Sequence, residues 1–175
     1  MAGYGTVDEP SRTQQQADEH RNVARVRAAG EALGLPMDIA RFPEGTRTAQ
    51  EAADAIGCPV GAIVKSLIFT VDDEVVLALV SGANQLDEAK LAAAAGGARC
   101  GRANADQVRA ATGYPIGGVP PIGLVTPVRE FLDEDLLAHD VVWAAAGTWH
   151  DVFPIDPRRL AEVSGGWVGS LRRAG

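Results

Sequence analysis

Apolar positions along the first third of the chain recur at two periods, which predict both helices and strands. Over residues 17–33 the apolar side chains return at helical spacing, and Gly34 with Pro36 ends this predicted helix. Over residues 37–42 the side-chain character alternates, which predicts a short strand. Residues 48–56 begin with the T-x-x-E pattern of a capping box, so we expect a second helix there.

The clearest pattern is a pair of apolar, β-branched runs in the middle of the chain. Residues 62–71 (AIVKSLIFTV) and residues 74–80 (EVVLALV) are separated only by Asp72 and Asp73. Two strand-like runs joined by two turn-forming residues predict a β-hairpin.

The second half of the chain alternates between capped helices and short strands. Each predicted helix begins at an Asp or Asn cap, and these helices cover residues 87–96, 104–112 and 156–163. Strands are predicted over residues 128–132 and 141–145, with an edge strand at 167–168. This irregular alternation favours an α/β (α+β) fold, with a mixed sheet surrounded by helices, over a doubly wound nucleotide-binding fold.

The length and composition indicate one globular domain. A chain of 175 residues with 46% hydrophobic and 22% charged residues has enough apolar surface for a real core. We expect a single domain over residues 17–175, preceded by a flexible polar tail over residues 1–16. The tail has no apolar segment typical of a secretory signal, and no run approaches the ~18 apolar residues of a membrane span.

Charge and cysteine content limit the classes of partner. The net charge of -7 argues against DNA as a partner and against binding along a nucleic-acid duplex. A few local cations would still suffice to hold a single-stranded end. Cys58 and Cys100 have neither metal-ligand spacing nor the density of a disulfide framework. We therefore expect a cytoplasmic protein without membrane contact, metal ion or cofactor.

Lys65 is the first candidate for chemistry because it lies within an apolar strand run, between Val64 and Leu67. An ammonium group there costs free energy unless it meets an anion or reaches water. A lysine beside a pocket is suited to hold a phosphate or a developing oxyanion. An edge-strand lysine that simply reaches solvent is an equally good interpretation of this one position.

The second and third candidates are a glycine-proline loop and a histidine. In the loop over residues 113–123, Gly117 and Gly118 would leave backbone N–H groups free as donors, and the prolines would fix the path. An ordinary turn is the alternative. His150 follows a predicted strand and Gly147, a common place for a site residue, although a lone histidine is more often structural. The P-loop, G-x-S-x-G and HExxH motifs are absent from the sequence.

Five segments in this order resemble one family: KSLIF, SGANQLD, ATGYPIGGVPPIG, FLDEDLL and AGTWHDVFPIDPRRL. The chain resembles the YbaK / prolyl-tRNA synthetase-associated editing domain over residues 42–166. The resemblance implies a mixed, barrel-like sheet and hydrolysis of the ester that links a small amino acid to the tRNA 3′ end. By this resemblance, Lys65 matches a lysine associated with the phosphate or terminal adenosine, and the loop matches one whose backbone amides engage the aminoacyl carbonyl. His150 matches a histidine of the synthetase-inserted and alanine-editing branches, which the YbaK branch that acts on Cys-tRNA does not clearly have.

The resemblance also has two departures. Leu124 stands where family members often carry histidine, and Ser66 stands where the alanine-editing branch tends to have asparagine. The expected catalytic residues are Lys65, Gly117, Gly118 and His150. The expected substrate contacts are Ser66, Val119, Pro120, Pro121, Gly147 and Asp133.

Three classes of function remain open from the sequence. The first is a deacylase that edits mischarged tRNA carrying Ala, Ser, Thr or Cys, acting alone or with an aminoacyl-tRNA synthetase. The second is a non-catalytic module that binds the acceptor end or acts as a regulatory protein. The Leu124 departure slightly favours this second class. The third is a structural interaction protein, in which Lys65, the loop and His150 would be scattered. The sequence does not choose between a monomer and a homodimer.

Overall fold

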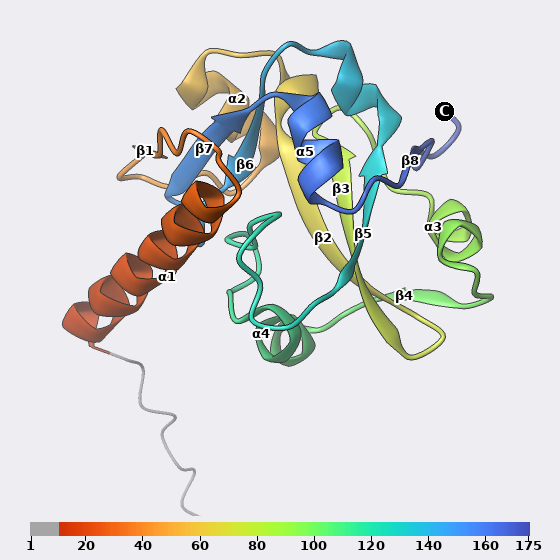
Figure 1. Cartoon of the computed structure of the whole chain (residues 1–175), viewed down its shortest axis with the longest axis horizontal. Helices are drawn as coiled ribbons and strands as arrows, with labels where there is room; N and C mark the ends of the chain where they lie inside the picture. Colours follow the sequence, from red (N-terminus) through yellow and green to blue (C-terminus); the bar gives the residue numbers. More distant parts are fainter. Residues whose placement is uncertain (1–10) are drawn as a thin grey trace, which may run out of the picture.

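The computed structural model describes residues 11–175, which form a mixed α/β fold (Figure 1). Its helices are α1 (Arg12–Ala32), α2 (Ala49–Ile56), α3 (Glu88–Ala95), α4 (Ala105–Thr112) and α5 (Pro157–Val163), with 3₁₀ turns η1 (Val60–Ala62) and η2 (Glu134–Ala138). Its strands are β1 (Ala40–Arg41), β2 (Val64–Val71), β3 (Glu74–Ser81), β4 (Cys100–Arg102), β5 (Arg129–Asp133), β6 (Val142–Ala145), β7 (Asp151–Ile155) and β8 (Val168–Gly169).

The strands form two sheets. One has the order β4-β2-β3-β5-β8, in which β5 pairs in parallel with β3 and with β8, and the other has the order β1-β7-β6. A single parallel bridge between Ile63 and Trp143 connects the start of β2 to β6. The mixed sheet is confirmed. Because the strands of residues 11–175 do not close into a ring, the barrel-like arrangement stays a prediction.

The predicted hairpin is confirmed as β2 and β3, paired from Val64–Ser81 to Val71–Glu74. Asp72 and Asp73 both have positive φ, 50° and 85°, as a two-residue primed turn requires. The Asp72 carboxylate accepts hydrogen bonds from the backbone N–H groups of Ala98 and Arg99, which hold its pKa below the usual value. This exposed carboxylate thereby ties the turn to the segment before β4.

Side-chain caps account for most of the helix starts. Thr48, Asp87, Asn104 and Asp156 each accept a backbone N–H in the first turn of their helix, and Asn104 with Gln107 forms a full capping box. At α2 the expected box is modified, because Glu51 accepts from the backbone N–H of Arg47. The local signals in the sequence therefore set these helix boundaries.

Several elements differ from the prediction. Helix α1 begins at Arg12, so part of the expected tail is helical, while residues 1–10 lie outside the described part. The strand expected over residues 37–42 is reduced to β1. Strands β4 and β7 were missed, because β4 is only three residues long and β7 contains Pro154, which argues against a strand in a local reading.

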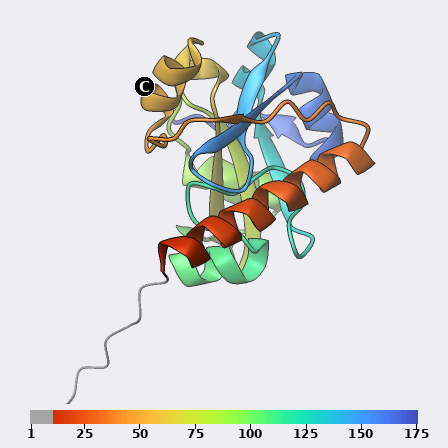
Figure 2. The same cartoon turned by 90° about the vertical axis from the view of Figure 1, so that its left-hand side faces the viewer.

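The core has two main clusters, on opposite faces of the five-stranded sheet. Val64 and Ile68 of β2 pack with Leu77, Leu79 and Leu132 on one face. The other face carries a second cluster made by Phe69, Val71, Val76, Ala78, Val80, Leu91 and Leu171. Helix α1 joins the first cluster through fully buried Val26, and Figure 2 shows it lying diagonally across one side of the molecule.

Within residues 11–175, one stretch of β2 has no paired strand on its outer side. The bridge to β6 is at Ile63, and pairing with β4 begins only at Phe69. Among the described residues, the outer edge of β2 over residues 64–67 is therefore left without a paired strand. Within the described part of the chain, no helix combines the length and apolar character needed to cross a membrane.

Candidate functional site

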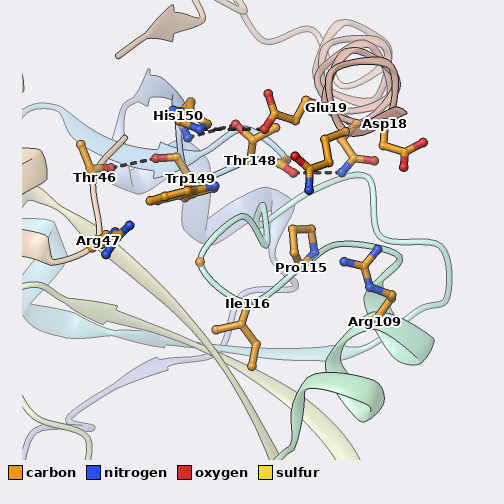
Figure 3. Close-up of a pocket in the computed structure, with 14 residues that line it drawn as sticks. Asp18, Glu19, Thr46, Arg47, Arg109, Pro115, Ile116, Thr148, Trp149 and His150 are labelled. Carbon is orange, nitrogen blue, oxygen red and sulfur yellow. Dashed lines mark hydrogen bonds and ion pairs between the residues drawn. The ribbon is translucent and has the colours of Figure 1, made fainter. Parts of the chain in front are cut away.

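Three adjoining cavities meet at the turn that carries Ile116 and Gly117, since both residues line all three. The largest, about 750 Å³, lies between α1 and the segment before β7 (Figure 3). We call the second, about 320 Å³, the β2 cavity because it is lined by β2 residues including Lys65. The third, about 110 Å³, is called the Ser66 recess and extends to Val108 of α4.

The shared turn has the geometry that its sequence dictates. The Gly118 N–H donates to the carbonyl of Pro115 at 3.0 Å, and Gly117 has φ +86°. A positive φ at the third position is the mark of a type II turn, where glycine is favoured because it has no Cβ. Ile116 is thereby held at the tip with 61% of its surface exposed. The turn presents an apolar side chain and the Gly117 backbone to the cavities.

The two glycines of this loop have different roles, which corrects the expectation that both amides face a ligand. Within residues 11–175 the Gly117 N–H has no hydrogen-bond partner, whereas the Gly118 N–H is used by Pro115. A Cβ on Gly118 would lie 2.9 Å from the Gly147 carbonyl oxygen and 2.9 Å from Thr148 Cα. Gly118 is therefore required for close packing of two loops, and Gly117 supplies the free donor.

Lys65 lines the β2 cavity, and its ammonium donates to the backbone carbonyl of Asn84. Burial lowers the pKa of Lys65, opposed by the nearby carboxylate of Asp133, and Arg102 lowers it further. An ammonium has three donors, so the contact with Asn84 leaves two for another acceptor. The lysine is thus a partly desolvated cation at one end of the site.

His150 lies on the wall of the largest cavity, with its side chain 15% exposed. Its Nδ1 lies 3.1 Å from the Phe42 carbonyl oxygen, which can only accept, so a neutral ring carries its proton on Nδ1. The Nε2 atom then has a free lone pair, and it lies 3.9 Å from the Glu19 carboxylate of α1. The geometry makes His150 an acceptor toward the cavity.

A charged chain attaches α1 to the segment that holds His150. Arg41 bonds both Glu19 and Asp151 at 2.8 Å, and Asp151, which is 3% exposed, accepts from the Thr148 hydroxyl at 2.6 Å. The Thr148 oxygen in turn accepts from the backbone N–H groups of His150 and Asp151. We call Glu19, Arg41, Asp151 and Thr148 the α1 clamp. It fixes the backbone on which His150 is carried.

An aromatic surface and several cations complete the site. Trp149 lines the two larger cavities, and in Figure 3 its indole faces Ile116 across the open space. The Arg47 guanidinium lies 5.1 Å from the centre of its ring, within cation–π range. Arg109 lines the largest cavity and Arg102 the Ser66 recess.

Sequence reasoning missed part of this wall. Glu19, Arg47, Ile116 and Trp149 were not singled out, because no local pattern distinguishes them from surface residues. Trp149 had one available signal, since it is next to His150 in the segment AGTWHD.

The structure brings most of the predicted site residues together. Lys65, Ser66, Gly117 and Val119 line the β2 cavity, while Gly147 and His150 line the largest one. The third class of function, in which these residues would be scattered, does not fit this arrangement. Groups of His, Cys, Asp or Glu suited to hold a metal ion are absent from residues 11–175.

Three expected substrate contacts lie elsewhere. Asp133 is fully buried and accepts from the Ser81 backbone and the Asn84 amide, so it supports the loop that meets Lys65. Pro120 and Pro121 are buried and line none of the three cavities. Leu124 also lies outside the site, in a groove that it shares with Pro121.

A family model describes this arrangement. Residues 43–163 match the aminoacyl-tRNA editing domain, and the chain belongs to this family. The matched range contains Lys65, the Gly117 turn and His150, and it excludes α1.

Individual relatives agree with this assignment. The chain is 36% identical over 146 residues to the proline–tRNA ligase of Nitratidesulfovibrio vulgaris, covering 82% of this chain and 24% of the ligase. It is 30% identical over 128 residues to the uncharacterized protein YwhH of Bacillus subtilis, covering 73% of this chain and 81% of that protein. The chain therefore spans about a quarter of the ligase and most of YwhH.

A solved structure is also similar over most of the chain. A crystal structure described as a candidate trans-editing enzyme for prolyl-tRNA synthetase superposes with a TM-score of 0.82 and 43% identity. The match covers 87% of this chain and 98% of that one. The arrangement of helices and sheets is thus shared with that structure.

Proposed function

We propose that this protein is an aminoacyl-tRNA deacylase that hydrolyses the ester of mischarged tRNA carrying a small amino acid. The observation that carries the proposal is the meeting of three chemically different groups at adjoining cavities: a cation, an unpartnered backbone N–H and a histidine acceptor. These groups are Lys65, Gly117 and His150. The family assignment supports the same chemistry.

The proposed reaction begins when water adds to the ester carbonyl carbon. His150 Nε2 takes a proton from this water, and the Gly117 N–H stabilises the oxyanion that forms. The bond from carbon to the ribose oxygen then breaks, and the proton held by His150 passes to that oxygen. The products are the free amino acid and a tRNA with its terminal hydroxyl restored. The Glu19 carboxylate faces the imidazolium formed between these steps.

The acceptor end would be held by local cations and an aromatic surface. Lys65 and Arg47 offer positive charge to backbone phosphates, although the whole chain carries -7. The Trp149 indole offers a face on which a base can stack, an interaction worth roughly 1–3 kcal/mol. Such contacts fit a single-stranded end rather than a duplex. We place the activity in the cytoplasm, with a synthetase as an optional partner.

The direct test is turnover of tRNA charged with Ala, Ser or Cys. We expect the purified chain to release many amino acids per protein molecule. Lys65→Ala and His150→Ala should each lower this rate by about a hundredfold, because each removes a group that acts on the reacting ester or its phosphate.

Matched controls use the same residue types away from the cavities. Lys90→Ala and His139→Ala should retain the parent rate, since neither residue lines the three cavities. Thermal unfolding would confirm that each variant is folded. If the protein slowed the loss of the ester instead, it would be a binding module, and full activity in Lys65→Ala would reject the assigned role.

A further inference from the structure

Asn84, in the loop that follows β3, bonds a cation with its backbone and two acids with its side chain. Its carbonyl accepts from the Lys65 ammonium, while its side-chain Nδ2 donates to Asp133 Oδ2 and to Asp135 Oδ2, both at 2.8 Å. A carboxylate can only accept, so these two acids use both hydrogens of the amide. One neutral residue therefore joins Lys65 to a pair of carboxylates.

The charge of Asp133 acts directly on Lys65. Burial has the largest effect and lowers the pKa of Lys65, the Asp133 carboxylate raises it, and Arg102 lowers it further. Asp133 is fully buried, so solvent would screen an ion pair with it only weakly. A lysine neutralised in such a pair would attract a second anion poorly, because the two opposite charges cancel.

Neutral donors satisfy the Asp133 carboxylate instead of a cation. The Ser81 N–H donates to Oδ2 and the Asp135 N–H donates to Oδ1, both at 3.2 Å. The Asn84 amide, at 2.8 Å, is the shortest of these three contacts. Because a buried charge needs hydrogen bonds or a counter-ion, removal of this amide would leave Asp133 in need of a replacement donor.

The loop that carries Asn84 is fixed from two directions. The Asn84 N–H donates to the Ser81 carbonyl at 2.9 Å, and the Arg173 N–H donates to the Gln85 carbonyl at 2.8 Å. Arg173 lies beyond the matched family range, residues 43–163. The last residues of the chain thus help to hold the carbonyl that meets the lysine.

We propose that Asn84 is a positioning residue that keeps the Lys65 ammonium apart from Asp133 and leaves it available to a substrate anion. This inference rests on the proposed deacylase function and adds a residue to it. The Asn84 carbonyl directs one N–H of the lysine, and the Asn84 amide satisfies the buried acid. Without that amide, Lys65 becomes the replacement donor for Asp133, and a substrate phosphate must compete with a carboxylate.

The two lysines of the sequence, Lys65 and Lys90, allow a direct measurement. Protein labelled with ¹³C at the lysine Cε atoms gives two lysine NMR signals, which Lys90→Arg assigns. The Lys90 ammonium donates to the Arg172 carbonyl at 2.7 Å and serves as the internal reference. An unchanged Lys90 signal shows that a variant is folded.

In Asn84→Ala, the Lys65 signal should titrate at a higher pH than in the parent, because a pair with Asp133 favours the charged lysine. Arg102 and Arg47, whose positive charges also face this part of the site, are present in both proteins. A merely structural role of Asn84 would loosen the loop without strengthening the pairing of Lys65 with an acid.

Deacylation kinetics give the second readout. Asn84→Ala should raise the KM for charged tRNA by about tenfold or more, the scale of one hydrogen bond to a charged group, with a smaller change in kcat. Adding Asp133→Asn removes the competing carboxylate and should return the KM toward the parent value. Gln85→Ala is the matched control, since this exposed amide in the same loop contacts Arg173 at 3.4 Å.

Gln85→Ala should leave both the Lys65 titration and the KM unchanged. An unmoved Lys65 titration in Asn84→Ala would overturn the proposal by itself, as would a KM that a folded double variant with Asp133→Asn does not restore. Absence of turnover on every ester would reject the deacylase function, while the Lys65 titration would still test the role of Asn84.

Discussion

Gly117 has both a backbone conformation that favours glycine and a proposed role in the reaction. Its φ of +86° belongs to the left-handed region, and its N–H is the donor assigned to the oxyanion. A Cβ at this position meets no atom closer than Trp149 Cβ, at 3.8 Å, so a substitution is limited by backbone strain and not by space.

We predict that Gly117→Ala lowers kcat by about tenfold or more, because relief of the strain turns the N–H away from the ester. The strain should also cost roughly 1–2 kcal/mol of stability. Gly96→Ala is the matched control, since Gly96 has φ +77° at the end of α3 with open space around it. Equal loss of stability in the two variants, with equal loss of activity, would contradict the role of the Gly117 amide.

At the scale of elements, α1 is the part of the molecule that closes the largest cavity. It lies outside the matched family range and contributes Glu19 and Asn22 to the cavity wall. The Asn22 amide donates to the Gly147 carbonyl, and the α1 clamp attaches the same helix to buried Asp151. Asn22 and Gly147 are 125 residues apart in the sequence. The position of His150 therefore depends on a helix from the other end of the chain.

Arg41→Ala tests this dependence. We expect a stability loss of roughly 1–3 kcal/mol, since Asp151 stays buried without its cation, and a fall in kcat as the His150 segment loosens. Arg21→Ala should have little effect, because the Arg21–Asp18 pair is an exposed contact within α1. Urea unfolding and deacylation rates measure both quantities. An unchanged kcat in Arg41→Ala would show that the clamp does not position His150.

Elements fixed by local signals were predictable, whereas those fixed by distant pairing were not. The β2–β3 hairpin and the caps at Thr48, Asp87 and Asn104 follow from adjacent residues. Strand β7 exists because β1 and β6 pair with it on either side, and no neighbour in the sequence records this. Lys65 and His150 were found through motifs, but Glu19 and Arg47 join them only in the folded chain.

At the scale of the whole molecule, a second groove lies outside the proposed site and contains an unusual acid. Glu130 of β5 lines it with Pro121, Leu124 and Val163. Its Oε2 is buried without a partner among residues 11–175, and desolvation raises the pKa of Glu130 to about 9. The folded chain therefore holds a proton at neutral pH that the unfolded chain, with an ordinary glutamate pKa of 4.5, has released.

This difference makes global stability depend on pH. Since the folded state binds the extra proton, stability should fall as the pH rises from about 4.5 toward about 9. Glu130→Gln keeps the shape without the titration, so we predict that it is more stable than the parent by roughly 4–5 kcal/mol at pH 8 and similar near pH 4.5. Urea unfolding at both pH values is the measurement. Parallel pH curves for the two proteins would mean that Glu130 ionises normally.

The type II turn leaves one side chain unusually free to vary. Ile116 occupies the second position of that turn, which accepts most residues, and it lies mostly in solvent while bordering all three cavities. Exchanges at this position therefore carry little risk to folding, yet each one changes the shape of every compartment simultaneously. Substitution of Ile116 alone, in evolution or by mutagenesis, can therefore change which ester the protein prefers.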